Sequence, residues 1–394
     1  MEAYFNDWLS LLVRWVHFIT GVAWIGASFY FNWLENHLQR QHEDPAIAGD
    51  LWAVHGGGFY YLKKFAVTPA QLPETLHWFK WEAYSTWLSG VALLSIVYYA
   101  NARAFMIDPG VADISVAAAI GIGIASMLIS WLVYDGLCRS PLARHGGALL
   151  VVISVLLLLL AWGLSISLSG RAAYIHVGAA IGTIMVANVF RVIIPSQKDL
   201  VAALTENRPP DAARGKNALM RSRHNNYFTL PVLFIMISNH YPGTFSHPWN
   251  WLVLAAIAII GVAIRHYFNV RHLPGRKVWI LVAALSAFGL LAVALKPGKP
   301  PVPDSGNGYP TTAQVLPIVL QRCTVCHAAS PSLAGFTAPP AGLVLESAAD
   351  IETAADRIYQ SSILVPTMPL GNLTQMTDQE RQTLTLWYQG FQLR

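Results

Sequence analysis

The sequence predicts an all-α protein in which a polytopic membrane bundle of about eight transmembrane helices precedes a small helical domain. Charged residues make up only 12% of the 394 residues, against about a quarter in a soluble protein of this length. Apolar runs long enough to cross a bilayer recur through residues 1–295 and then stop. Residues 296–311, rich in proline and glycine, read as a stiff linker that leads into a C-terminal domain at residues 312–394.

Eight apolar segments are long enough, or nearly so, to cross the roughly 30 Å apolar core of a lipid bilayer as helices. They cover residues 8–31, 83–100, 114–134, 147–168, 172–194, 227–241, 249–268 and 278–295. The sixth is short and contains Pro231, so we expect a broken helix that lines a cavity. The net charge of +5 is modest and indicates membrane orientation rather than nucleic-acid binding.

Two of the connecting segments are long. Residues 32–82 contain His55, then Gly56-Gly57-Gly58, then a run of aromatic residues and lysines. We expect an ordered segment at the membrane interface, because aromatic and lysine side chains anchor there. The glycines indicate a turn, with a backbone cradle for an anion as the alternative. Residues 191–226 form the most basic stretch of the chain.

The C-terminal domain is organised around the run Cys323-Thr324-Val325-Cys326-His327. A C-x-x-C-H run is the attachment signature of a c-type haem, in which both thiols bond to the haem and the histidine becomes an axial ligand. A redox dithiol and half of a zinc site share the cysteine spacing. The adjacent histidine and the lack of a second cysteine pair argue against both. We therefore expect one covalent haem c at Cys323, Cys326 and His327.

The order of the parts around this motif is typical of a class I cytochrome c. Helices are expected at 312–322 and near 350–362, and a final helix starts at the capping box Thr377–Glu380. Met368 lies in a loop between prolines and is the expected second axial ligand, which would raise the reduction potential. Met376 is its competitor, and core packing is the alternative interpretation of Met368.

The haem motif also predicts the orientation of the chain. Haem c is attached in the bacterial periplasm, so the C-terminus lies there and, with eight spans, the N-terminus lies there too. The segments then expected in the cytoplasm carry 17 lysines and arginines, and the outer segments up to the linker carry four. This distribution agrees with the positive-inside rule. We expect a bacterial inner-membrane protein whose C-terminal domain is periplasmic.

Histidines within apolar spans are costly and indicate functional sites. In the first span His17, Gly21 and Trp24 share one helical face, and the glycine leaves room for a flat macrocycle. Arg14, one turn outward, could meet a haem propionate. The other histidines are His176 and His240 toward the outer side, and His55, His77, His224 and His266 toward the inner side. These could hold one or two b-type haems, with hydrogen bonding between helices as the alternative.

Guanidinium and amide side chains gather toward the inner face. The expected substrate contacts are Arg191, Arg221, Arg223 and Asn225, and further polar candidates are Glu35, Lys80, Glu82, Asn188, His224, Asn226 and Arg265. An anionic, planar, amide-rich ligand would suit this mixture. A basic cytoplasmic rim that only sets the topology explains the arginines equally well.

The whole chain resembles a known family. The first span, Trp15 to Tyr30 with its His17 and Gly21, continues into Trp33-Leu34-Glu35 and ends, after eight spans, in the Cys-x-x-Cys-His domain. This combination resembles the bacterial membrane-bound urate oxidases, or urate hydroxylases, of the PuuD family with a fused cytochrome c. The resemblance implies oxidation of urate to 5-hydroxyisourate. It also implies that electrons pass to cytochrome c and the respiratory chain, with a soluble cytochrome c or a terminal oxidase as acceptor. At the level of residues it carries over only the haem motif.

Purine breakdown is cytoplasmic, so we expect the substrate pocket at the inner face, with electrons carried outward. Urate oxidation releases two electrons while one haem c stores a single electron, which independently favours a b haem in the membrane. A general base near the pocket would assist deprotonation, and His224, His77 or Glu35 could serve. The alternatives are a quinol-to-cytochrome electron-transfer protein without a urate site, and a transporter or haem-dependent sensor.

Overall fold

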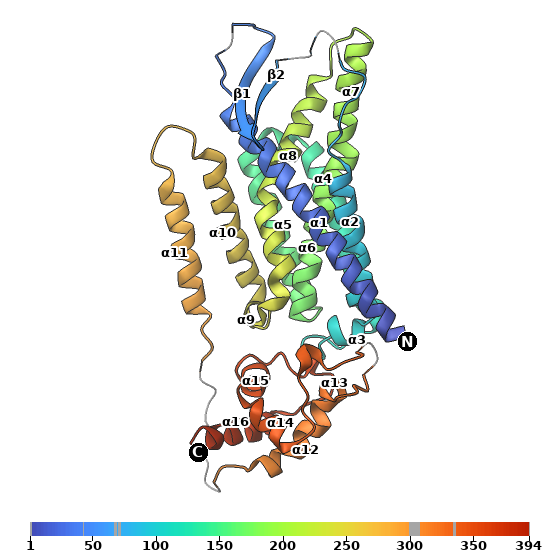
Figure 1. Cartoon of the computed structure of the whole chain (residues 1–394), viewed down its shortest axis with the longest axis vertical. Coiled ribbons are helices and arrows are strands. Elements are labelled where there is room, and N and C mark those ends of the chain that lie inside the picture. The colour runs from blue at the N-terminus through green and yellow to red at the C-terminus, as the bar shows by residue number, and fades with distance from the viewer. Residues whose placement is uncertain are drawn as a thin grey trace.

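The computed structural model describes residues 2–41, 43–66, 69, 72–298, 308–333 and 336–393. Figure 1 shows a long helical bundle with a smaller helical domain at one end. The chain is mostly helical, as predicted. Residues 299–307 of the predicted linker lie outside the described residues, so its stiffness stays a prediction.

Long helices make up the bundle. They are α1 (Glu2–His37), α2 (Trp81–Leu93), α4 (Val116–Arg139), α5 (Gly146–Ser165), α6 (Gly170–Asn188), α7 (Ile194–Thr205), α8 (Ala212–Ile237), α10 (Asn250–Val270) and α11 (Val278–Ala294). Two π-helical turns extend them, η1 (Leu94–Tyr99) after α2 and η3 (Val189–Ile193) between α6 and α7. Shorter pieces close one end, namely α3 (Ala102–Phe105), η4 (Ser238–His240) and α9 (Pro242–Phe245).

Several helices have the length and apolarity that a membrane span needs. Within the described part of the chain there are five, Asp7–His37, Val116–Arg139, Gly146–Ser165, Gly170–Thr205 and Asn250–Val270. They coincide with five of the eight predicted spans. The other three predicted segments are also helical, as α2 with η1, the second half of α8, and α11. The total of eight spans stays a prediction.

The sixth predicted segment lines a cavity, as predicted, but its helix is not broken. Helix α8 runs without interruption through Pro231, and its second half is the predicted segment. A proline is tolerated inside a helix where neighbouring helices pack closely around it, and here Gly261 of α10 lies against Pro231. The basic stretch at 191–226 is also helical, as α7 and the first half of α8, at the end of the bundle farthest from the C-terminal domain (Figure 1).

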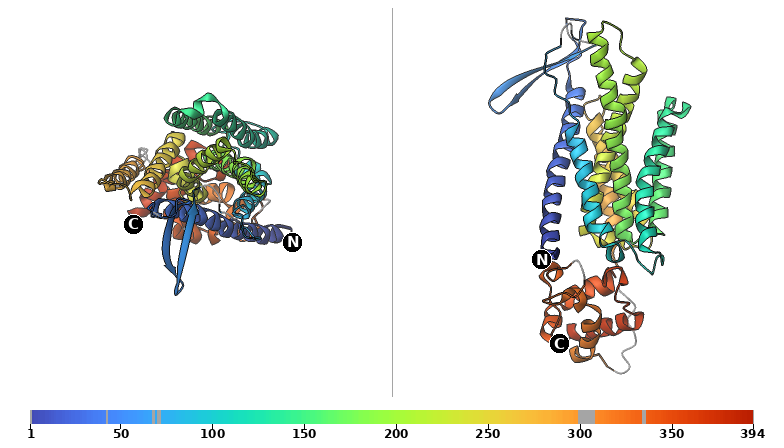
Figure 2. Two further views of the ribbon diagram at one scale, coloured as in Figure 1. Left: turned by 90° about the horizontal axis from the view of Figure 1, so that it is seen from above. Right: turned by 90° about the vertical axis from the view of Figure 1, so that its right-hand side faces the viewer.

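One segment departs from the all-α prediction. Strands β1 (Ile47–His55) and β2 (Gly58–Phe65) pair as an antiparallel hairpin. Gly56 and Gly57 have φ angles of +58° and +80°, which a two-residue hairpin turn requires and glycine adopts without strain. The glycines therefore form the predicted turn. Figure 2 shows the hairpin projecting sideways beyond the C-terminal end of α1.

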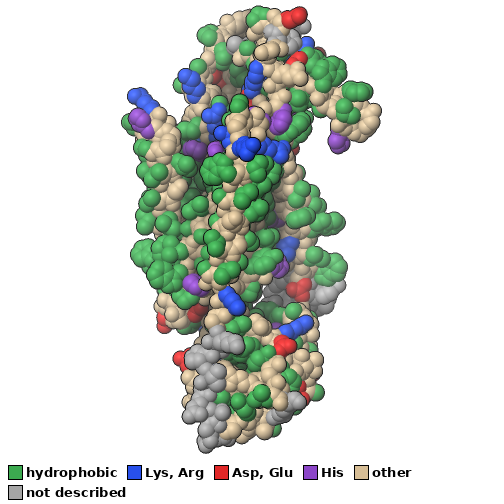
Figure 3. Space-filling model, turned by 90° about the vertical axis from the view of Figure 1, so that its left-hand side faces the viewer, with side chains coloured by type: hydrophobic (Ala, Val, Ile, Leu, Met, Phe, Trp, Pro, Cys, Tyr) green, Lys and Arg blue, Asp and Glu red, His purple; other side chains and the backbone are tan. Residues whose placement is uncertain are grey.

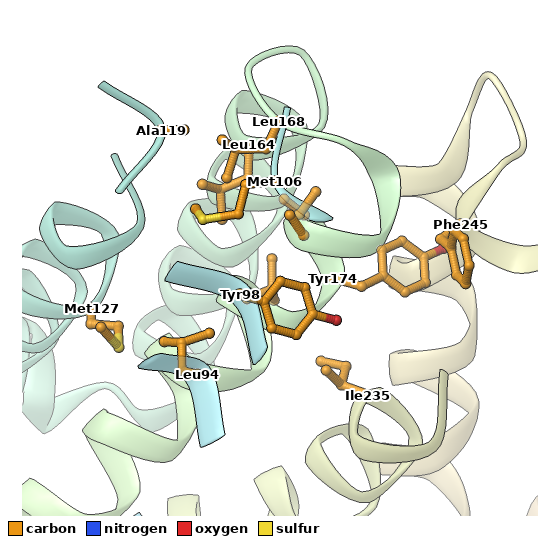
Figure 4. Packing of buried hydrophobic residues seen from close by; sticks show 14 of the residues in the cluster. Leu94, Tyr98, Met106, Ala119, Met127, Leu164, Leu168, Tyr174, Ile235 and Phe245 are labelled. Carbon is orange, nitrogen blue, oxygen red and sulfur yellow. The ribbon is translucent and has the colours of Figure 1, made fainter. Parts of the chain in front are cut away.

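Helix α6 lies at the centre of the bundle, packed against α4, α5 and α8 (Figure 2). Figure 4 shows part of this core, where the ring of Tyr174 on α6 lies between Ile235 and Phe245. The Tyr174 hydroxyl donates to the Asn250 carbonyl at 2.7 Å, so this polar atom is satisfied inside the apolar core. On the outside, apolar side chains such as Val293 stay exposed, as contact with lipid requires. Figure 3 shows lysine, arginine and histidine gathered above this apolar band, away from the C-terminal domain.

The C-terminal domain is a small cluster of short helices. They are α12 (Thr312–Arg322), α13 (Thr324–His327), η5 (Pro340–Gly342), α14 (Ala348–Thr353), α15 (Ala355–Tyr359), η6 (Gln360–Leu364), η7 (Leu370–Asn372) and α16 (Asp378–Gln392). The helix predicted at 312–322 is α12, and the one predicted near 350–362 is divided among α14, α15 and η6. The capping box predicted at Thr377 and Glu380 is present at the start of α16. Val315, Leu384 and Trp387 are buried where α12 packs on α16.

The C-terminal domain docks on the end of the bundle where α1 begins and α3 lies (Figure 1). The Thr337 hydroxyl donates to the Asp7 carboxylate. A Cβ added to Gly371 would lie 2.7 Å from the carbonyl oxygen of Ile107, so only glycine permits this approach between η7 and the segment after α3. The two parts are therefore in direct contact.

Candidate functional site

The Cys-x-x-Cys-His motif lies at the junction of α12 and α13. His327 Nδ1 is 3.0 Å from the carbonyl oxygen of Leu343. Because a carbonyl only accepts, Nδ1 carries the hydrogen and Nε2 keeps the lone pair that a metal ligand needs. Cys323 and Cys326 are free thiols. The donor set of two thiols and one oriented imidazole is the one that a c-type haem requires.

The competing interpretations of the cysteine pair find less support. Redox-active dithiols have a lowered thiol pKa, whereas burial raises the pKa of Cys323 to about 11 and also raises the pKa of Cys326. A zinc site needs a group of metal-ligating side chains, and the described residues contain no group of three or more histidine, cysteine or acidic side chains that could hold a metal ion.

The two candidate methionines differ in their surroundings. Met376 is 3% exposed and packs in the core of the C-terminal domain. Met368 is half-buried on a loop held at both backbone ends, since its N–H donates to Ser361 at 2.9 Å and its carbonyl accepts from Arg381 at 3.0 Å. Core packing therefore accounts for Met376, and Met368 stays the candidate axial ligand.

A cavity of about 410 Å³ lies inside the bundle beside His17, a size typical of ligand pockets. His17 Nδ1 is 3.0 Å from the Thr86 carbonyl oxygen and 3.0 Å from Ser89 Oγ. The carbonyl again places the hydrogen on Nδ1 and leaves the lone pair on Nε2. The cavity is lined mainly by apolar side chains, and four glycines from α1, α2 and α6 widen it, Gly21, Gly90, Gly178 and Gly182. Arg14 and Asn239 also line it.

The other outer histidines do not line this cavity. His176 is fully buried on α6; its Nδ1 is 2.8 Å from the Ala172 carbonyl oxygen, and its Nε2 has no partner. That nitrogen faces Gly123 of α4, where a Cβ would lie 2.4 Å from it. His240 is exposed on η4. The structure thus does not bring His17, His176 and His240 together in one cavity.

The predicted substrate contact Arg221 belongs to a buried ion pair. Its side chain is fully buried, and Nη2 donates to Asp135 of α4 at 2.8 Å. Nη1 donates to Asn188 of α6 at 3.1 Å. The guanidinium charge is therefore neutralised within the bundle, and the interaction joins α4, α6 and α8.

Asn225 and His224 belong to the same network. The Asn225 side chain accepts from Asn188 at 2.9 Å and donates to the Met185 carbonyl at 2.9 Å. His224 Nδ1 is 2.8 Å from the Tyr134 hydroxyl, which also accepts from Asn188 at 3.1 Å. Tyr134 and Asp135 are not among the residues predicted for the site. The signal for them was an acidic residue at the end of an otherwise apolar span, which calls for a buried cation nearby.

The remaining predicted residues lie at the rim. Arg191, Arg223 and His55 are exposed, and His77 is 71% exposed with its Nε2 3.9 Å from Glu82. Glu35 forms ion pairs with Lys64 at 2.7 Å and Arg40 at 2.8 Å. His266 is exposed on α10, with its Nδ1 2.8 Å from the Tyr227 hydroxyl. The structure therefore does not gather these residues with Arg221 and Asn225.

Comparison with known protein families shows the family to which the helical bundle belongs. The model of the family described as urate oxidase N-terminal matches residues 3–296. The chain belongs to this family. The matched urate oxidase region covers the whole helical bundle, including the His17 cavity and the polar network around α8. Cys323 to His327 lie beyond it. Searches of curated proteins and of solved structures find no match.

Proposed function

We propose that this urate oxidase family member is a membrane urate oxidoreductase that oxidises urate to 5-hydroxyisourate and passes the electrons to a haem c in its own C-terminal domain. The observation that carries the proposal is the covalent continuity of the two parts. The urate oxidase match ends at residue 296, and a Cys-x-x-Cys-His motif with an oriented His327 follows in the same chain.

The electron count supports a second redox centre. Urate and one water give 5-hydroxyisourate, two protons and two electrons, whereas one haem c takes up a single electron. Cys323, Cys326, His327 and Met368 would hold the haem c, and His17 would be one axial ligand of a b haem in the cavity. When bound, the two haems would supply one-electron redox chemistry. Arg14 lines the same cavity and would face a propionate.

The proposed orientation places the C-terminal domain in the periplasm of a bacterium and the opposite end of the bundle in the cytoplasm. Lysine and arginine gather at that opposite end (Figure 3), in agreement with the positive-inside rule. Urate would then enter from the cytoplasm, and a soluble cytochrome c or a terminal oxidase would accept electrons outside. Of the proposed general bases His224, His77 and Glu35, only His224 is partly buried.

The test uses the purified chain with its bound cofactors, oxidised and kept free of oxygen. Urate should reduce the haem c, as the rise of its α-band absorbance reports. A pyridine haemochrome spectrum should contain both b and c haem. Reduction by a quinol but not by urate would overturn the proposal and favour an electron-transfer protein of the quinol-to-cytochrome type.

A further inference from the structure

A second buried arginine, Arg265 of α10, has no counter-ion among the described residues. It is 6% exposed, and its only side-chain hydrogen bond to the described residues runs from Nε to Asn226 Oδ1 at 3.1 Å. None of the described acidic side chains lies within ion-pair distance of it, whereas the comparable Arg221 has Asp135 at 2.8 Å. Burying an unpaired charge is expensive, so an anion from outside the described residues would stabilise Arg265.

One neighbour of Arg265, Asn226, has a side-chain donor without a hydrogen-bond partner among the described residues. Asn226 of α8 is 1% exposed; its Oδ1 accepts from Arg265 and from Asn269 Nδ2 at 2.8 Å, while its own Nδ2 has no partner. On α1, the ring of Phe29 lies 3.9 Å from the guanidinium carbon of Arg265. The ring covers one face of the guanidinium, so a ligand reaches the terminal nitrogens along their edge, in the guanidinium plane.

We propose that Arg265 and Asn226 bind the substrate urate anion, in an inference that rests on the function proposed above. A planar anion with oxygen and nitrogen acceptors along one edge can accept two in-plane hydrogen bonds from the guanidinium fork. The unused Nδ2 of Asn226 supplies a further donor. One ligand would then accept hydrogen bonds from both the Arg265 guanidinium and Asn226 Nδ2.

This site lies on the side of α8 that faces α10, as the partners of Asn226 show. The predicted contacts Arg221 and Asn225 face α4 and α6 instead. Those two residues would then hold the helices together rather than touch substrate.

The site is also close to the His17 cavity. Helix α1 contributes Ile25 to the cavity and Phe29 to the Arg265 site. Residues four apart lie on the same face of a helix, about 6 Å apart along its axis. An anion held by Arg265 would therefore lie just beyond the end of the cavity that points away from the C-terminal domain. In this position urate, the electron donor, would lie next to the proposed membrane haem.

The test measures urate binding separately from urate oxidation. The full chain is reduced beforehand with dithionite, so that bound urate cannot react, and equilibrium dialysis with labelled urate gives the dissociation constant. Arg265→Gln should weaken binding about 10- to 100-fold, as expected for loss of a charge-assisted hydrogen-bonded pair. Asn226→Ala should weaken it about tenfold, and Arg265→Lys should fall between Arg265→Gln and the unchanged protein.

Arg271→Gln is the matched control, because Arg271 also stands at the end of α10 over a phenyl ring, that of Phe268 at 5.2 Å, but is exposed. It should leave the affinity unchanged. Haem c absorbance and thermal unfolding identify variants that do not fold, in which case Arg265→Lys, which keeps the charge, replaces Arg265→Gln.

The outcomes separate this inference from the proposed function. If the unchanged chain oxidises urate and the folded Arg265 and Asn226 variants bind urate with unchanged affinity, the inference fails and the proposed function stands. If the unchanged chain neither binds nor oxidises urate, both fail. If phosphatidylglycerol binds at Arg265 while urate affinity is the same in Arg265→Gln, the anion is a lipid headgroup and the inference is overturned.

Discussion

Four of the described histidines share one hydrogen-bond arrangement. Each has Nδ1 within 3.0 Å of a backbone carbonyl oxygen, and they are His17, His37, His176 and His327. This fixes the tautomer with a free lone pair on Nε2, as is typical of histidines that ligate metals. His327 belongs to the Cys-x-x-Cys-His motif and His17 lines the cavity. His37 instead stacks on Trp33, and His176 Nε2 is buried against Gly123 outside the cavity. At the scale of single residues, His17 is thus the best-placed ligand in the membrane domain.

Replacing His17 by Ala should remove b-haem absorbance from the pyridine haemochrome spectrum and leave the c-haem content unchanged. The reason is that His17 is the only one of the described histidines that lines the cavity. His240→Ala serves as the control, because His240 is exposed and should leave both haems in place. Equal b-haem content in the His17 variant and the unchanged chain would exclude His17 as the ligand.

Replacing Arg221 by Leu should destabilise the bundle by about 1–3 kcal/mol, because the buried Asn188 side chain loses a donor and Asp135 keeps only the exposed Arg139 as its cation. The double variant Arg221→Leu with Asp135→Leu should regain part of the loss, since the mostly buried carboxylate is then gone and the exposed Arg139 is solvated by water. Thermal unfolding of the detergent-solubilised chain measures both. The exposed Arg223 offers the comparison, and its replacement by Leu should change stability little. A single variant as stable as the unchanged chain would show that the ion pair does not hold the helices.

At the scale of elements, the glycines of α1, α2 and α6 determine the space available inside the bundle. Gly182 of α6 lines the cavity. A Cβ added there would have no described atom within 4 Å apart from the adjacent residues and the backbone of its own helix. Gly163 of α5 has the same freedom but does not line the cavity. The two positions therefore separate a change of cavity volume from a change of helix propensity.

Gly182→Leu should lower b-haem content several-fold while the bundle stays folded, because leucine fills the cavity and is a better helix former than glycine by about 0.7–1 kcal/mol. Gly163→Leu brings the same gain in helix propensity and should retain the haem. The ratio of b to c haem in the purified proteins gives the answer. Full b-haem content in Gly182→Leu would place the haem elsewhere.

Helix α16 is tied to the haem motif by Glu380. Its carboxylate accepts from the Thr377 N–H at 2.7 Å in the capping box and from Arg322 Nε at 3.0 Å, next to Cys323. Burial alone would raise the pKa of Glu380, but the Thr377 and Arg322 hydrogen bonds outweigh it, so the pKa lies below its usual range. A lowered folded-state pKa stabilises the fold above the unfolded-state pKa of about 4.3, and the contribution is lost as the pH falls through the folded-state value.

Glu380→Gln should therefore reduce the protection of α16 amides against hydrogen exchange at pH 7, by about 1 kcal/mol for a weakened cap. The difference from the unchanged chain should shrink as the pH falls below about 4, because protonation then removes from the unchanged chain the charge that the variant already lacks. Peptide-resolved exchange of the full chain at both pH values measures this. A difference that is constant with pH would exclude the carboxylate charge as its cause.

At the scale of the whole molecule, the proposed function requires electrons to cross the contact between the C-terminal domain and the end of the bundle. Gly371 is the tightest point, with a positive φ of +55° and a Cβ position 2.7 Å from the Ile107 carbonyl oxygen. Gly308 also has a positive φ, of +82°, but its Cβ position is open.

Gly371→Ala should weaken docking by about 1–3 kcal/mol, the usual cost of overpacking, and so slow urate-driven reduction of haem c about tenfold or more. Gly308→Ala carries a comparable backbone strain without the clash and should leave the rate near that of the unchanged chain. Stopped-flow absorbance at the haem c α band measures the rate. Equal rates for the two variants would show that this contact does not limit electron transfer.

Local patterns were enough to predict most of the elements. The apolar runs predicted helices at all eight positions, and the capping box predicted the start of α16. The urate oxidase resemblance, which rested on the first span and the order of the parts, is confirmed at the level of the family. Two predictions failed. Helix α8 passes unbroken through Pro231, where Gly261 of a distant segment packs beside it. Residues 47–65 form a hairpin around the predicted glycine turn, although an all-α fold was predicted.

The sequence by itself determined what depends on neighbours along the chain: apolar spans, the Cys-x-x-Cys-His spacing, helix caps and the family. Only the tertiary structure decided which polar side chains are paired. Arg221 and Arg265 look alike in sequence, but Asp135, 86 positions away, neutralises one, and no described carboxylate reaches the other. Pairing depends on which helices pack together, and long-range packing leaves no periodic trace in the sequence around either arginine.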